Sequence, residues 1–189
     1  WQIVAGITGA TVRFCPVTPG GEIDMDALRG MIGGRTRMVA VVHVSNTLGT
    51  INPVGEIVAM AHEAGALTMV DATQSVPHMP VDATAIGSDF LAFTGHKMCG
   101  PTGIGVLAAA PGRLEAMEPF LGGGEMISDV TTEGSTWNDI PWKFEAGTPN
   151  IAGTIAFGAS IDYLTSLGLD AVAAAEHELL VYGTEALTS

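Results

Sequence analysis

Two short apolar runs that each end in ionisable residues restrict the fold of this chain more than any other feature. Residues 66–70 lead directly to Asp71, and residues 90–95 lead to His96 and Lys97. Apolar runs of this length, bounded by turn residues, predict buried strands. In an open α/β sheet, ligands bind beyond the carboxyl ends of the strands, so these charged groups are expected to face one crevice.

Helical segments alternate with these strands. Asp24 is placed to cap a short helix, and Pro53 and Gly65 bracket a second helix whose apolar residues recur at helical spacing. The alternation predicts an α/β fold, with a mainly parallel sheet and flanking helices. The expected strands are residues 10–17, 37–44, 66–71, 89–97 and 104–108.

The second half of the chain is less regular. A short helix is expected at residues 113–117, and residues 122–141 show no pattern that assigns them. Residues 154–167 are apolar nearly all round, which predicts a buried helix. A last helix is expected to begin with Asp170 as its N-cap and to keep helical spacing as far as Ser189.

Lys97 is one of two lysines in the chain and is expected at the end of a buried strand. An ammonium that loses hydration gives up its proton more readily, and the neutral amine can then attack a carbonyl. The alternative is a lysine whose stem carries the charge out into water. Thr94 and His96 favour the first interpretation, because short hydroxyl and imidazole donors beside an unencumbered backbone suit a phosphate.

Asp71 completes a recognisable set of groups. Pyridoxal phosphate (PLP) needs a lysine for its aldehyde and a carboxylate that keeps its ring nitrogen protonated. Lys97 and Asp71 would supply these two groups. Asp71 could instead cap the turn before Gln74.

Four motifs carry a resemblance that spans nearly the whole chain: His43–Gly49, Val70–Gln74, Thr94–Gly105 and Phe144–Asn150. In these motifs the chain resembles the large domain of a Suf-type (group II) cysteine desulfurase. That group belongs to the class V aminotransferase branch of the PLP enzymes of fold type I, which are aspartate aminotransferase-like.

The resemblance implies a role for each predicted site residue. Lys97 would bond covalently to the cofactor and act as the catalytic base, and Asp71 would face the pyridinium nitrogen. The other roles implied are the phenolic oxygen for Gln74, the phosphate for Thr94 and His96, a place beside the substrate for Asn46, and the phosphate of the neighbouring subunit's cofactor for Thr148. The last role implies a homodimer with shared active sites.

The implied reaction converts L-cysteine to L-alanine and leaves the sulfur as an enzyme-bound persulfide. A Suf-type acceptor protein would take this sulfur for iron–sulfur cluster assembly. Residues 1–168 would be a PLP-binding large domain without its N-terminal portion, and residues 169–189 would begin a helix that leads to a small C-terminal domain. The persulfide-forming cysteine would lie beyond Ser189, so this fragment alone is expected to be inactive.

Other functions fit the same motifs. A selenocysteine lyase, a kynureninase or an epimerase of the same family would share these residues, and a non-catalytic homologue could act as a scaffold. Intact Lys97, Asp71 and His96 argue against the scaffold.

Composition excludes further classes. A net charge of −13 argues against a nucleic-acid surface, and no apolar run is long enough to cross a membrane. Cys15 and Cys99 lack the spacing of a disulfide framework or a zinc site, so both are expected to be packing residues in a protein of the reducing cytoplasm. No metal site is expected, and His43 is expected to be a hydrogen-bonded core side chain.

Overall fold

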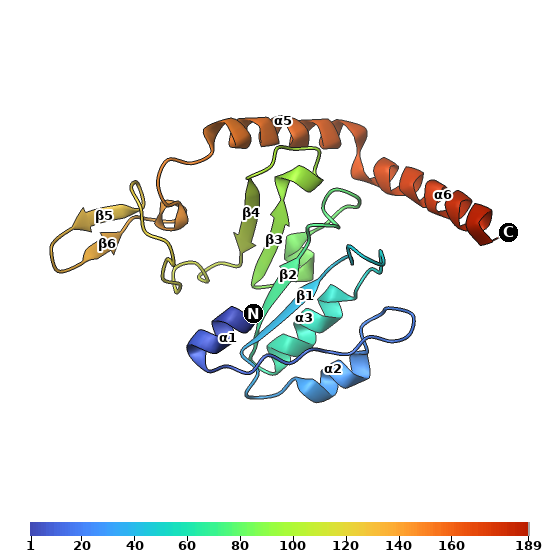
Figure 1. Ribbon diagram of the computed structural model, residues 1–189, viewed down its shortest axis with the longest axis horizontal. Helices are drawn as coiled ribbons and strands as arrows, with labels where there is room; N and C mark the ends of the chain where they lie inside the picture. Colours follow the sequence, from blue (N-terminus) through green and yellow to red (C-terminus); the bar gives the residue numbers. More distant parts are fainter. Residues whose placement is uncertain (189) are drawn as a thin grey trace.

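The computed structural model describes residues 1–188, and its centre is a four-stranded sheet (Figure 1). The strands are β1 (Met38–Val42), β2 (Leu67–Asp71), β3 (Phe90–Thr94) and β4 (Gly105–Ala109), in that spatial order. The first three are parallel, and β4 runs antiparallel to β3. This confirms the expected α/β fold, and the parallel strands end at a common edge.

Four helices accompany the sheet, and the sequence predicted the second and third of them. They are α1 (Gln2–Thr8), α2 (Met25–Met31), α3 (Val54–Glu63) and the short α4 (Ala83–Ile86). The Asp24 side chain accepts a hydrogen bond from the backbone N–H of Ala27 at 2.9 Å, which confirms it as the cap of α2. The core joins α3 to the middle strands through Val54, Val58, Val70, Ala72 and Leu91.

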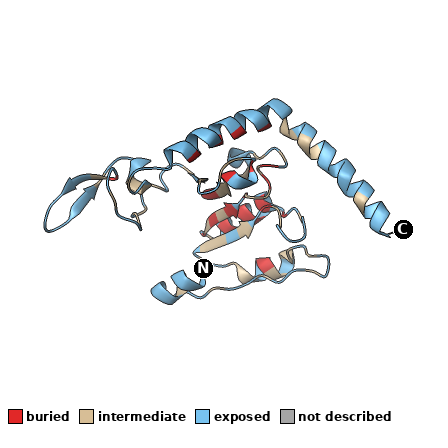
Figure 2. Ribbon diagram, turned by 45° about the horizontal axis from the view of Figure 1, so that its top comes forward, coloured by how far each residue is buried: buried red, intermediate tan, exposed pale blue. Residues whose placement is uncertain are grey.

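The rest of the chain extends away from this core. A hairpin of β5 (Ile127–Val130) and β6 (Ser135–Trp137) lies on one side, and α6 (Leu169–Thr188) points away on the other (Figure 1). Between them run two pieces of helix, the 3₁₀ turn Trp142–Phe144 and α5 (Ile151–Leu167). Buried residues concentrate in the sheet and its neighbours, whereas α6 has none (Figure 2).

Several expectations for single elements were wrong. Residues 10–17 form no strand: apart from one bridge between Val17 and Ile23, no neighbouring backbone pairs with this segment in the described chain. Residues 113–117 form no helix, and residues 113–116 are turns, because a short segment that follows Pro111 and Gly112 cannot offset the cost of starting a helix. The β5–β6 hairpin was not predicted.

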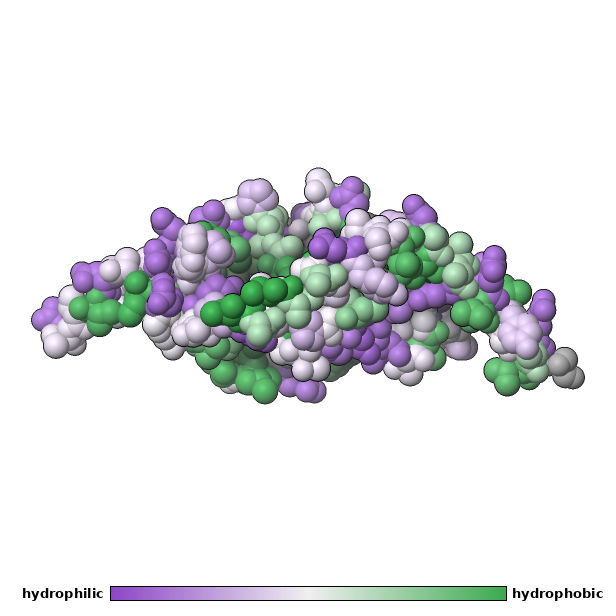
Figure 3. Space-filling view, turned by 90° about the horizontal axis from the view of Figure 1, so that it is seen from above, coloured by the Kyte–Doolittle hydropathy of each residue, from purple (hydrophilic) through white to green (hydrophobic). Residues whose placement is uncertain are grey.

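The two long helices also differ from expectation. Helix α5 buries only Gly153, Phe157, Ser160 and Leu164, not its whole circumference. Helix α6 begins at Leu169, so Asp170 lies in its first turn and does not cap it. Seen from the α5 side, hydrophobic side chains are spread over the surface from the hairpin end to the α6 end (Figure 3). None of the helices within residues 1–188 is both long enough and apolar enough to span a membrane.

Candidate functional site

The candidate site lies at the carboxyl edge of the parallel strands. Asp71 is the last residue of β2, Thr94 is the last residue of β3, and the 3₁₀ turn Gly95–Lys97 follows at once. Asp71 pairs in register with Ala92. The sheet therefore brings Asp71, Thr94, His96 and Lys97 to one edge, as the two apolar runs predicted.

The turn that carries Lys97 is held by its own hydrogen bonds. The Thr94 hydroxyl lies 2.8 Å from Nδ1 of His96 and 3.4 Å from the Ile104 carbonyl. The backbone N–H of Gly95 donates to the same Ile104 carbonyl at 2.9 Å. A Cβ at Gly95 would come within 2.7 Å of the Ile104 side chain, so only glycine fits there without movement.

Lys97 is exposed in this structure, together with His96. The expectation that the lysine is dehydrated at the end of a buried strand was therefore wrong for these described residues. The physical reason is its position: the buried strand ends at Thr94, and Lys97 lies three residues further, in a turn at the open edge. The ammonium is accessible to a ligand that binds at this edge.

Asp71 combines the two interpretations that the sequence left open. One carboxylate oxygen, Oδ1, accepts a hydrogen bond from the backbone N–H of Thr73 at 2.9 Å, so Asp71 does cap the turn before Gln74. Among the described residues no donor contacts Oδ2, and the residue is exposed. Capping fixes the carboxylate and leaves one oxygen for a ligand.

The remaining predicted residues lie around the same edge or beside the Lys97 turn. Gln74 is half-buried in the turn after β2. Asn46 is exposed in the loop after β1, where its side-chain oxygen accepts a 3.4 Å hydrogen bond from the Thr47 hydroxyl. Thr148 is exposed just before α5. No hydrogen bond within residues 1–188 joins Asn46, Gln74 or Thr148 to Lys97 or Asp71.

His43 is buried, as expected of a structural histidine, but its hydrogen bonding was mispredicted. It is 8% exposed, and burial lowers its pKa. Its backbone N–H donates to the Asp71 carbonyl at 2.8 Å, yet no described residue forms a hydrogen bond with the buried ring nitrogen Nδ1. The sequence could indicate burial from the apolar neighbours, whereas partners for the ring depend on how other segments pack.

The opposite edge of the sheet holds a carboxylate that is buried and hydrogen-bonded to several residues. Asp89, immediately before β3, accepts hydrogen bonds from Nε2 of His62 (2.9 Å), the backbone and hydroxyl of Thr68 (2.7 and 2.9 Å) and the guanidinium of Arg113 (2.7 and 2.6 Å). Burial alone would raise the pKa of Asp89, but these hydrogen bonds outweigh burial and lower it from 3.8 to about 2. This network was not predictable from the sequence, because its members are distant along the chain.

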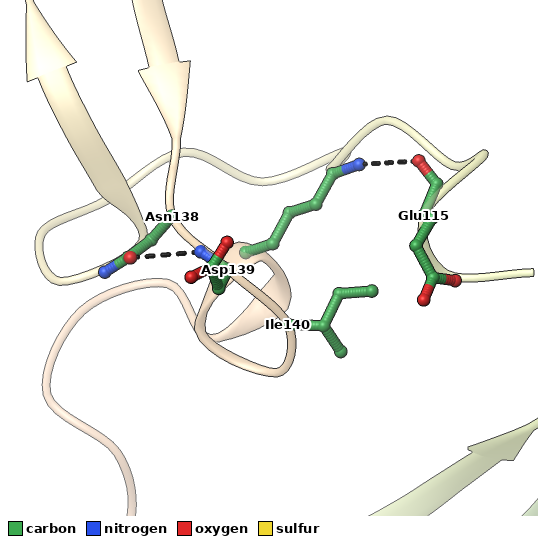
Figure 4. Close-up of a pocket in the computed structure, with 5 residues that line it drawn as sticks. Glu115, Asn138, Asp139 and Ile140 are labelled. Atoms are coloured by element: carbon green, nitrogen blue, oxygen red, sulfur yellow. Dashed lines mark hydrogen bonds between the residues drawn. The ribbon is translucent and has the colours of Figure 1, made fainter. Parts of the chain in front are cut away.

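Two cavities of the structure lie away from the predicted site residues. One of about 340 Å³ is bounded by Glu115, Asn138, Asp139, Ile140 and Lys143, and the Lys143 ammonium there donates to the Glu115 carbonyl at 3.2 Å (Figure 4). A second, about 290 Å³, lies beneath the Lys97 turn and is lined mainly by apolar residues, among them Met98 and Leu164. None of the predicted site residues lines either cavity.

The two cysteines differ in their surroundings. Burial, and then the nearby Asp24 carboxylate, raise the pKa of Cys15, which disfavours the thiolate and fits a packing role. Cys99 is exposed, with a backbone φ of 58° in the left-handed region. The expectation that Cys99 packs as a small apolar residue was therefore wrong, because it follows the sharp turn after Lys97 and faces outward.

This arrangement defines an open α/β sheet with a lysine and a carboxylate at adjacent strand ends. The family description "Aminotransferase class-V" matches residues 1–189, so the chain belongs to the class V aminotransferase family. The cysteine desulfurase of Haloferax volcanii is 54% identical over 188 residues, which are 100% of this chain and 44% of that protein. A probable cysteine desulfurase of Halalkalibacterium halodurans is 52% identical over 100% of this chain and 46% of its own length.

Solved structures give the same result. The cysteine desulfurase CsdA of Escherichia coli, in its S-sulfonic acid form, matches with a TM-score of 0.96 and 39% identity over 100% of this chain and 47% of that chain. The chain thus spans about half the length of the relatives it matches. A more distant neighbour, C-DES, was solved with glycine covalently linked to its PLP cofactor (TM-score 0.78, 27% identity, 88% of this chain and 46% of that chain).

Proposed function

We propose that the protein containing this chain is a PLP-dependent cysteine desulfurase. The observation that carries the proposal is the placement of Asp71 and Lys97 at the ends of adjacent strands, both exposed at one edge of the sheet. The names of the similar proteins support the substrate, L-cysteine. That this protein belongs to the Suf-type subgroup is a finer proposal, which rests on the four motifs in its sequence.

The donor set fits PLP in chemical terms. When bound, PLP supplies an aldehyde that reacts with amines and a protonated ring that accepts electrons. Lys97 would hold the aldehyde carbon, and the Oδ2 oxygen of Asp71 would face the ring nitrogen. Thr94 and His96 would hold the phosphate, for which hydroxyl and imidazole donors are suited.

Lys97 would have a second task after the substrate amine displaces it from the cofactor. Its Nζ would then take the proton from the α-carbon of L-cysteine, and it would return a proton as alanine forms. Gln74 would hydrogen-bond the phenolic oxygen of the cofactor, and Asn46 would lie beside the substrate. The sulfur would pass to a cysteine outside this chain and then to a Suf-type acceptor for iron–sulfur cluster assembly.

The organisation of the whole protein is part of the same proposal. Residues 1–168 would form most of a PLP-binding large domain, and the helix from residue 169 would lead to a smaller domain. Two free cysteines support a reducing cytoplasmic location. In a homodimer, Thr148 would reach the phosphate of the cofactor in the neighbouring subunit, which its exposure permits.

Subunit mixing tests the shared site. Full-length Lys97→Ala and Thr148→Ala subunits are combined, so that each heterodimer has one site lacking both groups and one intact site. Activity should then exceed the sum of the two separate variants. If heterodimers form without recovery, although each variant alone is impaired, Thr148 does not serve the neighbouring site.

Product analysis tests the reaction. The full-length protein with PLP and dithiothreitol should convert L-cysteine to alanine and sulfide in equal amounts, whereas the Lys97→Ala protein should not. One structural neighbour is a cystine C–S lyase with cysteine persulfide as its product, at a TM-score of 0.78 and 28% identity. Cysteine persulfide from cystine, without alanine from cysteine, would favour that second activity.

A further inference from the structure

Asn150 lies where two separate parts of the candidate site meet. It follows the Thr148-Pro149 pair and precedes the first residue of α5. Its side chain makes two hydrogen bonds, one as an acceptor and one as a donor. Oδ1 accepts from the backbone N–H of Gly153 at 3.0 Å, and the Nδ2 amide donates to the carbonyl of Gly103 at 3.2 Å.

The first hydrogen bond is an ordinary helix cap. The second one is not required for capping, because Gly103 lies 47 residues away, in the turn that follows Lys97. Gly103 has a φ of +74°, which favours glycine and gives the turn a fixed shape. The close fit continues at Gly153, where a Cβ would overlap the Asn150 carboxamide.

Helix α5 supports the same turn along its length. Its buried residues Gly153, Phe157, Ser160 and Leu164 recur at helical spacing and form one face. A Cβ at Gly100 would lie 2.9 Å from the Ser160 hydroxyl and 3.1 Å from the Phe157 ring. Met98, the neighbour of Lys97, packs against Phe157 and Leu164. The helix passes directly over the turn between β3 and β4 (Figure 1).

We propose that Asn150 is a positioning residue for Lys97: its carboxamide fastens the 100–105 turn to the start of α5 and so fixes the place of the lysine. Packing presses the turn against the helix face, and a directional hydrogen bond at the helix start adds a constraint on movement along the helix axis. The importance of this position for the cofactor rests on the proposed function. The mechanical constraint itself does not depend on it.

Three variants of the full-length protein separate capping from fastening. Asn150→Asp keeps the oxygen that caps α5 but replaces the amide donor with a second acceptor facing the Gly103 carbonyl. Asn150→Ser also caps, and it is too short to reach Gly103. Asn150→Ala removes both interactions. Asp24→Ala is the matched control, because it removes the cap of α2, a helix that shares no hydrogen bond with residues 95–105 within the described chain.

Hydrogen exchange of the apo-protein measures the constraint without any cofactor. The amides of Met98 and Gly100 both donate to the Gly95 carbonyl and report on the turn. In Asn150→Asp and Asn150→Ser, exchange in residues 95–105 should rise about fivefold, the factor expected for a lost hydrogen bond of ordinary strength, with α5 unchanged. Asn150→Ala should accelerate both segments, and Asp24→Ala should accelerate only α2.

Cofactor release supplies the second measurement. PLP should leave the Asn150→Asp holo-protein several-fold faster than the wild type, and the Asp24→Ala protein should release it at the wild-type rate. Wild-type exchange in residues 95–105 of both Asn150→Asp and Asn150→Ser would overturn the inference and leave Asn150 as a cap only. Faster exchange in a protein that never binds PLP would instead refute the proposed function and leave the constraint standing.

Discussion

The carboxylates at the two edges of the sheet differ in burial and in the number of hydrogen bonds they accept. Asp89, at the edge where β3 begins, has a side chain 3% exposed and is enclosed by donors from three other segments. Asp71, at the edge where β2 ends, is exposed and accepts one hydrogen bond from its own turn. A carboxylate whose hydrogen bonds are all made within the chain stabilises the fold, whereas one held by a single bond can still bind a ligand.

The largest expected effect is at the open edge. Asp71→Ala in the full-length protein should lower the rate of alanine formation on the order of 10³-fold, because the ring nitrogen loses the carboxylate that keeps it protonated. The free energy of unfolding of the apo-protein should change by less than about 1 kcal/mol, the cost of one exposed turn hydrogen bond. Near-normal turnover by the Asp71→Ala enzyme with PLP bound would contradict the assignment.

Asp89→Ala should show the reverse pattern. Removing this buried carboxylate leaves the Thr68 donors and the His62 ring without their acceptor and the charge of Arg113 unpaired, at an expected cost of about 3 kcal/mol. Urea unfolding measures this cost. Asp129→Ala is the control, since Asp129 is exposed in the hairpin and should cost less than about 0.5 kcal/mol.

A loss of stability in Asp71→Ala as large as that in Asp89→Ala would remove the distinction between the two edges. So would a thousandfold loss of turnover in an Asp89→Ala protein that is folded and loaded with PLP.

The free energy of unfolding should depend on pH through Asp89. Because the pKa of Asp89 is about 2 in the fold and 3.8 without it, the folded state favours the ionised form. Its contribution is complete above about pH 5 and is lost as the pH falls towards 2, amounting to at most about 2.5 kcal/mol. Urea unfolding measured from about pH 5 to about pH 2 should show that the free energy of unfolding declines as the pH falls. This decline should be shallower in Asp89→Asn than in the wild type. Equal pH dependence in both proteins would contradict the assigned role.

The smallest effect is expected at α6. Nδ1 of His78 lies 2.8 Å from Oε1 of Glu176, and this hydrogen bond joins α6 to the turn after β2, with both side chains 46% exposed. Glu176→Gln should change the free energy of unfolding by less than about 0.5 kcal/mol, as usual for exposed pairs. A cost comparable to that of Asp89→Ala would show that α6 is integral to the core.

The same contrast explains what the sequence could predict. The strands that lead to Asp71 and Lys97 were predictable, because strands in the middle of a parallel sheet read as continuous apolar runs in the sequence. Helix α3 was predictable because its buried residues recur at helical spacing. These patterns arise where the chain supplies both packing surfaces itself, as it does in the sheet.

The remaining features depend on contacts between distant segments. The β5–β6 hairpin has mostly exposed residues, so no alternation marks its strands. Asn150 was visible as part of a motif, but its hydrogen bond to Gly103 joins residues 47 positions apart. The exposure of Lys97 depended on where β3 ends, and the sequence placed that end three residues too late.

The central claim is that Lys97 carries the cofactor, and chemical labelling tests it most directly. The full-length protein is loaded with PLP, reduced with borohydride, digested and analysed by mass spectrometry, with Lys97→Ala as the control. The account predicts that the label is attached to Lys97 and is absent from the control. A label on Lys143, which lines the cavity bounded by Glu115 and Asn138, or no covalent label at all, would contradict it.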